Sequence, residues 1–221
     1  MRIEQNPPVV AIDGPSGSGK GTVAKKVAGE LGFQYLDSGA LYRVLALGAQ
    51  RRRISLDDED TLVELAAALD LRFEGERVVL DGEDVGRAIR DEEISAAASK
   101  VAVLPRVRRA LLQRQRAFRQ SPGLVAEGRD MGSVVFPDAV LKIFLTASAE
   151  ERAKRRHKQL SEKGMRANLA HLLQDIAERD QRDSSRNVAP LVQSPDAIVI
   201  DTTGTSIAEV VARIMELYAA R

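Results

Sequence analysis

The segment GPSGSGKGT, residues 14–22, has the residue types and spacing of a loop that holds phosphate groups. Gly14 is followed by four residues and then by Gly19 and Lys20, and the apolar run VVAI (9–12) precedes the segment. Glycines let consecutive backbone N–H groups face a phosphate, a helix N-terminus adds positive potential, and a lysine reaches the terminal phosphates. A flexible glycine turn before a helix would explain fewer of these positions. The segment therefore predicts a nucleotide-binding site.

The position after the loop lysine departs from the commonest form of such loops. A Ser or Thr at this point usually carries Mg²⁺, whereas here the residue is Gly21 and the hydroxyl is displaced to Thr22. This departure argues against direct metal ligation by the loop, and no residue is assigned as a metal ligand. The residues expected to bind the donor phosphates are Gly14, Pro15, Ser16, Gly17, Ser18, Gly19, Lys20, Gly21 and Thr22.

Arginines recur at the start of expected helices (Arg43, Arg106 and Arg108), at the end of an expected strand (Arg129) and in the cluster ERDQRDSSR (Arg179, Arg182 and Arg186). Loops at the carboxyl edge of a parallel sheet build ligand sites, and a guanidinium there offers a planar, always-charged fork to phosphate oxygens. We therefore expect several of these arginines to bind anions. Arginines on regular helix faces, such as Arg119 and Arg213, are expected to be solvated surface charges.

The composition limits the alternatives. The chain has 221 residues, 44% of them hydrophobic, which favours one soluble globular domain with a real core. The absence of cysteine excludes disulfides, thiolate zinc sites and cysteine nucleophiles. A net charge of +1 gives no field that favours nucleic acid. No apolar stretch is long enough to cross a bilayer, so we expect a soluble cytoplasmic protein that binds no membrane.

Alternating strands and helices must position these residues. Short apolar runs predict strands at 9–12, 33–36, 123–130, 140–148 and 197–202. Helical periodicity predicts helices at about 20–31, 40–53, 57–69, 92–103, 105–119, 149–164, 168–183 and 206–220. The pattern is typical of a parallel sheet covered by helices on both faces. The segment 71–85 interrupts it with a predicted antiparallel hairpin that turns at Gly75 and at Asp81-Gly82.

Five segments in this order make the chain resemble the bacterial cytidylate kinases from end to end: GPSGSGKGT, LDSGALYR, AAASKVAVLPRVR, GRDMGSVVFPDA and RDQRDSSRNVAP. The resemblance implies a P-loop NTP hydrolase fold with a five-stranded parallel sheet, and ATP-dependent phosphorylation of CMP and dCMP with Mg²⁺. It also implies a monomer. The whole chain, 1–221, would then be one kinase domain with a core at about 1–62, 104–150 and 166–221, an antiparallel monophosphate-binding insert at about 63–103, and a helical lid at about 151–165.

The resemblance also implies individual roles in binding the acceptor nucleotide. The residues expected to hold its phosphate are Arg43, Arg129 and Arg186. Those expected to recognise cytosine are Ser99, Arg108 and Asp130, a donor and acceptor set that complements the edge of that base. Those expected to read the ribose are Arg179 and Asp183, and Ser38 is expected in the same pocket.

The cations of the segment 149–164 have two interpretations. They form either a solvated helix face or a lid that closes over the donor phosphates, and the resemblance favours the lid. Arg152 and Arg156 lie one helical turn apart and are the lid arginines we assign to catalysis, together with Lys20 and Arg129. Phosphoryl transfer depends on positioning and charge neutralisation, which such arginines supply.

Three other functions stay open at this point. A P-loop kinase for another acceptor, such as UMP or a small metabolite, would not need both Arg108 and Asp130. A protein that hydrolyses GTP as a switch would need a guanine-reading Asn-Lys-x-Asp segment, which is absent. A nucleic-acid-binding protein has the arginines in its favour, but the near-neutral charge and 4% aromatic content count against it.

Overall fold

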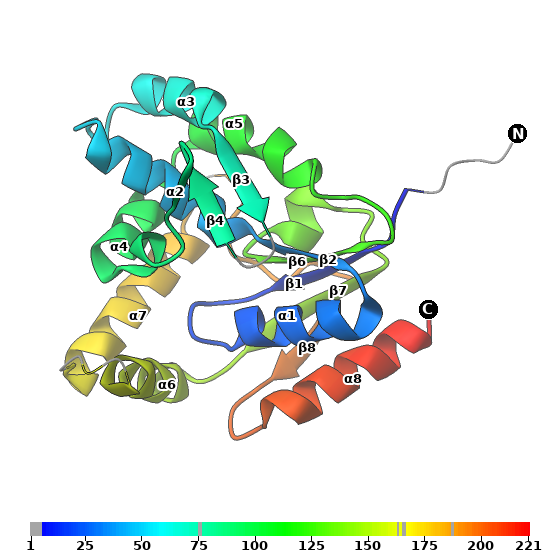
Figure 1. The fold of residues 1–221 in the computed structure, drawn as a ribbon. Coiled ribbons are helices and arrows are strands. Elements are labelled where there is room, and N and C mark those ends of the chain that lie inside the picture. The colour runs from blue at the N-terminus through cyan, green and yellow to red at the C-terminus, as the bar shows by residue number, and fades with distance from the viewer. Residues whose placement is uncertain (1–5, 75–76, 163, 165–166, 187) are drawn as a thin grey trace, which may run out of the picture. The chain divides into compact units, whose positions relative to one another are not determined.

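The chain divides into two compact units. The structure is a computed structural model that describes residues 6–74, 77–162, 164, 167–186 and 188–221. The first unit contains Met1–Leu36 and Ala117–Arg221, and the second unit contains Asp37–Arg116. Both units combine helices with strands (Figure 1).

The first unit is built on the predicted parallel sheet. In their order across it, the strands are β2 (Gln34–Asp37), β6 (Leu124–Gly128), β1 (Val9–Asp13), β7 (Leu141–Thr146) and β8 (Ile198–Asp201). β1 pairs in parallel with β6 and β7, and β7 pairs in parallel with β8. Every residue of β1 and β6 is buried, so both faces of these central strands are covered. The structure thus confirms the predicted fold class.

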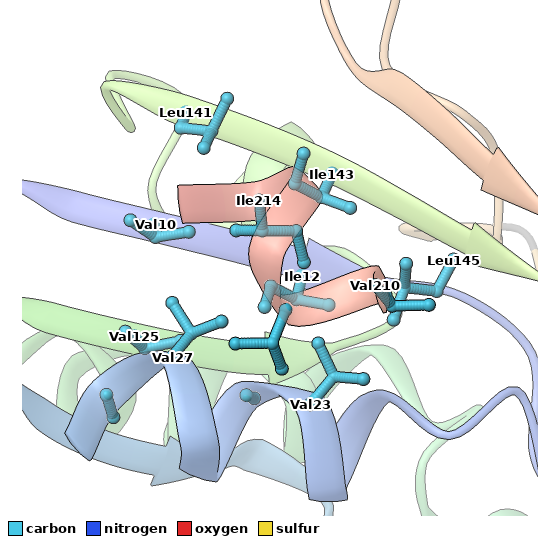
Figure 2. Packing of buried hydrophobic residues seen from close by; sticks show 13 residues of the cluster. Val10, Ile12, Val23, Val27, Val125, Leu141, Ile143, Leu145, Val210 and Ile214 are labelled. Carbon is cyan, nitrogen blue, oxygen red and sulfur yellow. The ribbon is translucent and has the colours of Figure 1, made fainter. Parts of the chain in front are cut away.

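The core of the first unit lies between the sheet and two helices, α1 (Lys20–Leu31) and α8 (Ile207–Ala219). Figure 2 shows Val10 and Ile12 of β1 together with Val23 of α1 and Ile214 of α8, all of them fully buried. Burying one such aliphatic side chain contributes about 1.5–3 kcal/mol. The core therefore fixes the strand ends, and with them the loops that follow the strands.

The carboxyl ends of the two central strands are aligned. Asp13, the last residue of β1, stands opposite Gly128, the last residue of β6, in the parallel register. Gly14 and Arg129, the next residues along each strand, therefore leave the sheet side by side at one edge. A motif near the start of the chain and one past its middle are brought together in this way.

Two further helices and a short π-helix complete the described parts of the first unit: α6 (Ala149–Glu162), α7 (Leu169–Ser184) and η2 (Met131–Val135). α6 and α7 pack on each other through a small cluster of buried side chains, namely Ala153, Leu160, Leu172 and Ile176. Part of the expected lid, residues 163 and 165, lies outside the described residues.

Arg119 corrects one sequence expectation. Helix α5 (Pro105–Arg116) ends before it, so Arg119 does not lie on a helix face. Its Nε donates to the carbonyl oxygen of Pro7 at 2.7 Å, its Nη1 pairs with Asp138 at 2.7 Å, and its side chain is only 15% exposed. The expectation of a solvated cation was therefore wrong for Arg119.

The second unit contains helices and a small antiparallel sheet. Its other helices are α2 (Ser38–Arg51), α3 (Glu59–Ala68), the 3₁₀ turn η1 (Ala88–Arg90) and α4 (Glu92–Val101). Its sheet has the order β3 (Leu71–Glu74), β4 (Arg77–Leu80) and β5 (Glu83–Asp84), with antiparallel pairing throughout. The predicted turn at Asp81-Gly82 is confirmed by φ values of 51° and 83°, whereas Gly75 lies outside the described residues.

The second unit, Asp37–Arg116, is wider than the 63–103 range expected for the insert, because α2 and α5 also belong to it. The division of the chain into core, insert and lid stays a prediction. Among the helices of the described residues, none has both the length and the apolar composition needed to span a membrane.

Candidate active site

The glycine-rich loop joins the end of β1 to α1, where the sequence predicts it. Gly14 has φ +150°, and a Cβ on it would lie 2.0 Å from the carbonyl oxygen of Leu145, so only glycine fits. Gly19 has φ +90° and occupies the N-cap position of α1, where it has no side chain with which to cap the helix. The first N–H groups of α1 therefore lack a capping side chain, as an anion site at a helix N-terminus requires.

Two polar side chains of the loop are buried. Lys20 is 8% exposed and its Nζ donates to the carbonyl oxygen of Pro15, within the loop itself, at 3.1 Å. The Ser18 hydroxyl is fully buried and has no hydrogen-bond partner among the described residues. A buried polar atom without a partner is uncommon, and a bound water or a ligand can supply the missing partner.

The glycine at position 21 has a steric explanation that the sequence did not reveal. A Cβ at this position would lie 2.8 Å from Oε1 of Glu127, a buried residue of β6. The same oxygen accepts a hydrogen bond from the Tyr35 hydroxyl at 2.8 Å. The carboxylate thus fills the space that a serine or threonine side chain would need, while Thr22 is exposed. Sequence reasoning missed Glu127, although an acid inside the apolar strand VAEG was a signal.

Two of the predicted acceptor arginines converge on the carboxylate of a third predicted residue, Asp183. Asp183 of α7 is 2% exposed; its Oδ2 accepts from Arg129 Nε at 2.7 Å, and its Oδ1 accepts from Arg186 Nη2. Arg129 follows β6, and Arg186 lies just beyond the end of α7. We call these three residues the arginine clamp. Asp183, which was expected to read ribose, therefore bonds two of the three arginines that were expected to hold phosphate. Arg179, half-buried, lies one helical turn before it.

The backbone after Arg129 is held by the last residue of β1. The carboxylate of Asp13 accepts from the N–H groups of Met131 and Gly132, each at 2.8 Å. Burial raises the pKa of Asp13 to about 6, against the opposing effect of these two hydrogen bonds; Asp130 raises the pKa further and Arg129 lowers it. Asp130 itself is 5% exposed.

The cations of α6 differ in their surroundings. Arg152 is 5% exposed, pairs with Asp180 of α7 at 3.0 and 2.6 Å, and donates to the carbonyl oxygen of Ser16 in the loop at 3.1 Å. Arg156 is half-buried and its Nη1 lies 3.4 Å from the Gln159 side-chain oxygen. The structure thus separates two arginines that the sequence made equivalent.

Arg155 also contacts the phosphate loop, although only Arg152 and Arg156 among the lid arginines were assigned to catalysis from the sequence. It donates to the hydroxyl and carbonyl oxygens of Thr202 at 3.0 and 2.6 Å, and to the carbonyl oxygen of Ser18 at 3.4 Å. Thr202, directly after β8, also donates to Ser18 O at 3.1 Å. Only the fold could reveal this arrangement, because Thr202 is far from the loop in sequence.

The second unit holds the other predicted acceptor residues. Arg43 pairs with Asp37 at 2.5 Å, and Ser38 is buried at the start of α2. The Ser99 hydroxyl is buried without a hydrogen-bond partner among the described residues. Arg108 is 8% exposed, donates to the carbonyl oxygen of Ala102 at 3.0 Å, and lies 5.7 Å from the centre of the Tyr42 ring. Buried serine and arginine side chains of this kind are typical of a binding surface rather than of solvated charge.

The described residues contain no group of three or more His, Asp or Glu side chains that could hold a metal ion. Gly21 has no hydroxyl, and both oxygens of Asp13 already accept backbone hydrogen bonds. These residues fit a magnesium ion that is carried by nucleotide phosphates, which Mg²⁺ commonly accepts together with several waters.

A glycine loop between a buried parallel strand and a helix, with an arginine clamp at the same sheet edge, defines a P-loop phosphotransferase. Residues 10–220 match the family model for cytidylate kinase, and the chain belongs to that family. A cytidylate kinase of Chromobacterium violaceum is 62% identical over 211 residues, which cover 96% of this chain and 95% of that relative. One of Colwellia psychrerythraea is 58% identical over 218 residues, covering 96% of each chain.

Among solved structures, an uncharacterized protein from Eubacterium ventriosum aligns with 97% of this chain and 99% of its own, with a TM-score of 0.52 and 14% sequence identity. At that identity the similarity concerns the fold alone. The family assignment therefore rests on the sequence matches.

Proposed function

We propose that the protein transfers the γ-phosphoryl group of ATP to CMP and dCMP, forming CDP and dCDP. The observation that carries this proposal is the alignment of β1 with β6, which brings the phosphate loop and the arginine clamp to one edge of one sheet. A donor-phosphate site and a second anion site side by side suit transfer between two nucleotides. Membership of the cytidylate kinase family supports the same reaction.

The donor half consists of the loop Gly14–Thr22. Lys20 and the loop amides hold the β- and γ-phosphates, and the Mg²⁺ that ATP carries is part of the substrate. When bound with ATP, Mg²⁺ would neutralise negative charge on the donor phosphates. Arg152 and Arg156 supply further positive charge as part of the lid at about 151–165. Arg152 also holds the phosphate loop through its bond to Ser16, whereas Arg156 is more accessible.

The acceptor half uses the residues assigned from the sequence. Arg43, Arg129 and Arg186 bind the monophosphate, and Ser99, Arg108 and Asp130 recognise cytosine. Arg179 and Asp183 bind the ribose and Ser38 lies near it, with Asp183 also holding the clamp arginines. No general base is needed, because a phosphate monoester is already an ionised nucleophile at neutral pH. Transfer then depends on in-line positioning and on charge neutralisation. We further propose that the protein acts as a cytoplasmic monomer.

A coupled assay of ADP release with CMP, dCMP, UMP, AMP and GMP tests the proposed function. We expect turnover with CMP and dCMP and little with the other three acceptors. The variant Lys20→Ala is the control, because activity that belongs to this loop must fall with it. Equal rates with CMP and UMP, or with CMP and AMP, would refute the cytosine assignment. Tight GTP binding by titration calorimetry, without CMP-dependent ADP release, would refute the kinase assignment.

A further inference from the structure

The short π-helix η2 begins two residues after Arg129 of the clamp, and the side chain of its N-cap residue does not cap it. Asp130 occupies its N-cap position but makes no side-chain capping bond. The carbonyl oxygen of Asp130 accepts from the N–H groups of Val134 and Val135 at 2.9 and 3.1 Å. The N–H groups of the first two η2 residues, Met131 and Gly132, need other acceptors, as at the start of any helix. π-helical turns of this kind occur frequently at functional sites.

Asp13 supplies both acceptors from a distant part of the chain. Its Oδ1 accepts from Met131 N and its Oδ2 from Gly132 N, across sequence separations of 118 and 119 residues. Each carboxylate oxygen is thus used once, in charge-assisted hydrogen bonds of 2.8 Å. Gly132 is confined on its other side as well, since a Cβ there would lie 3.1 Å from the Lys142 side chain. The segment 129–132 is therefore held at a defined position relative to β1.

We propose that Asp13 is a positioning residue for the acceptor: it caps η2 in place of Asp130 and so fixes Arg129 and Asp130 where they meet the monophosphate and the cytosine. The inference rests on the proposed function, because it assigns a cause to acceptor binding at that same site. Asp13 directly precedes the phosphate loop, so the strand that carries the donor loop also sets the acceptor residues. The side chain of Asp13 bonds Met131 and Gly132 and not the phosphate loop.

A carboxylate is needed here for a chemical reason. An asparagine side chain offers one acceptor oxygen, and its NH₂ group would face the second backbone N–H. Burying a charged carboxylate is costly, which agrees with the raised pKa of Asp13, on which Asp130 and Arg129 act in opposite directions. If the side chain at position 13 only had to fill space, an uncharged residue would serve as well.

The test compares Asp13→Asn with the native chain, using Asp138→Asn as a matched control. Asp138 is also a first-unit aspartate, but its side chain is 56% exposed and its partner is Arg119. In Asp13→Asn we expect the KM for CMP to rise about tenfold, the KM for ATP to change less than about twofold, and the preference for CMP over UMP to fall at least about threefold. The control should match the native chain in all three quantities.

The outcomes separate the two proposals. A native chain that does not phosphorylate CMP would overturn the proposed function and this inference with it. A native chain that is active, with an Asp13→Asn variant whose KM values for CMP and ATP change equally or not at all, would overturn the inference alone. If Asp13→Asn does not fold, Asp13→Glu is measured in its place, because it keeps the charge but displaces the oxygens. If neither variant folds, Asp13 is a requirement of the fold, and the positioning role is wrong.

Discussion

Two aspartates on helix α7, three residues apart, belong to different halves of the proposed site. Asp180 pairs with Arg152, which in turn donates to the carbonyl oxygen of Ser16 in the phosphate loop. Asp183 bonds Arg129 and Arg186, the arginines proposed to hold the acceptor phosphate. One helix therefore positions a donor-side arginine and the acceptor-side clamp. An aspartate–arginine pair thus has two different roles on this helix, and the position of the arginine determines the role.

The ion pairs of the two aspartates also differ in the number of arginines involved and in the other contacts of those arginines. Arg152 bonds Asp180, Ser16 and Ala147, so in this structure it holds the loop in place. Arg129 and Arg186 place two guanidinium groups on a single carboxylate, which concentrates positive charge beside β6. We therefore assign Asp180 to the donor side and Asp183 to the acceptor side. Three kinetic predictions test this division, and a fourth concerns Asp13 at the end of β1.

The largest effect is expected from Arg129→Ala. Loss of charge-assisted hydrogen bonds to the acceptor phosphate, about 3 kcal/mol, should raise the KM for CMP about a hundredfold. The KM for ATP should change less than about threefold. Steady-state kinetics with each substrate varied in turn give both values. Equal losses for the two substrates would mean that Arg129 does not belong to the acceptor side.

Asp183→Asn should give the next largest effect, about tenfold or more in the KM for CMP. An amide cannot bond both guanidinium groups as the carboxylate does, so Arg129 and Arg186 lose their common support. If Asp183 acts partly through Arg129, the double variant with Arg129→Ala should lose less than the sum of the two single losses. Fully additive losses would instead indicate that Asp183 acts independently of Arg129.

Asp180→Asn should affect the donor side. It leaves Arg152, which is 5% exposed, without its carboxylate, and we expect the free energy of unfolding to fall by about 1–3 kcal/mol. The KM for ATP should rise a few-fold while the KM for CMP stays constant. Urea denaturation and the same kinetics provide the measurements. A selective increase in the KM for CMP would abolish the distinction between the two aspartates.

The smallest effect concerns Asp13, whose carboxylate bonds backbone N–H groups instead of arginines. Its folded pKa, about 6, lies above the unfolded value of 3.8. Protonation of Asp13 in the folded chain therefore contributes stability that is complete below the unfolded pKa and is lost as the pH rises through about 6. Relative to Asp13→Asn, the native chain should gain about 1 kcal/mol in the free energy of unfolding between about pH 7 and about pH 5. Urea titrations of both proteins at each pH measure the difference, and a constant difference would contradict the raised pKa.

Much of the fold could be predicted from the sequence because its signals are local. The apolar run before Gly14, the glycine spacing and Lys20 act within one strand, loop and helix, and the structure places each of them as predicted. The end of α5 was predicted three residues too late, and this error hid the contacts of Arg119 with Pro7 and Asp138. Periodicity does not locate helix ends well, because the last turn depends on what the chain meets there.

The site residues were predicted by type and by resemblance, but their partners were not. Glu127 explains Gly21 only because β6 lies beside β1, and Arg155 reaches the loop only because β8 ends near it. In the sequence every arginine carries the same charge. Which of them is buried, and against which carboxylate, depends on strand order and register.

Short patterns of glycine, apolar and charged residues encode the phosphate loop, the alternating parallel fold and membership of the cytidylate kinase family, so these could be predicted from the amino-acid sequence. The bonds from Asp13 to a turn 118 residues away, and the different partners of Asp180 and Asp183, follow from the folded arrangement of the chain. The physical reason is that hydrogen bonds and ion pairs act over a few ångströms, and only the folded sheet and helices bring such distant residues that close.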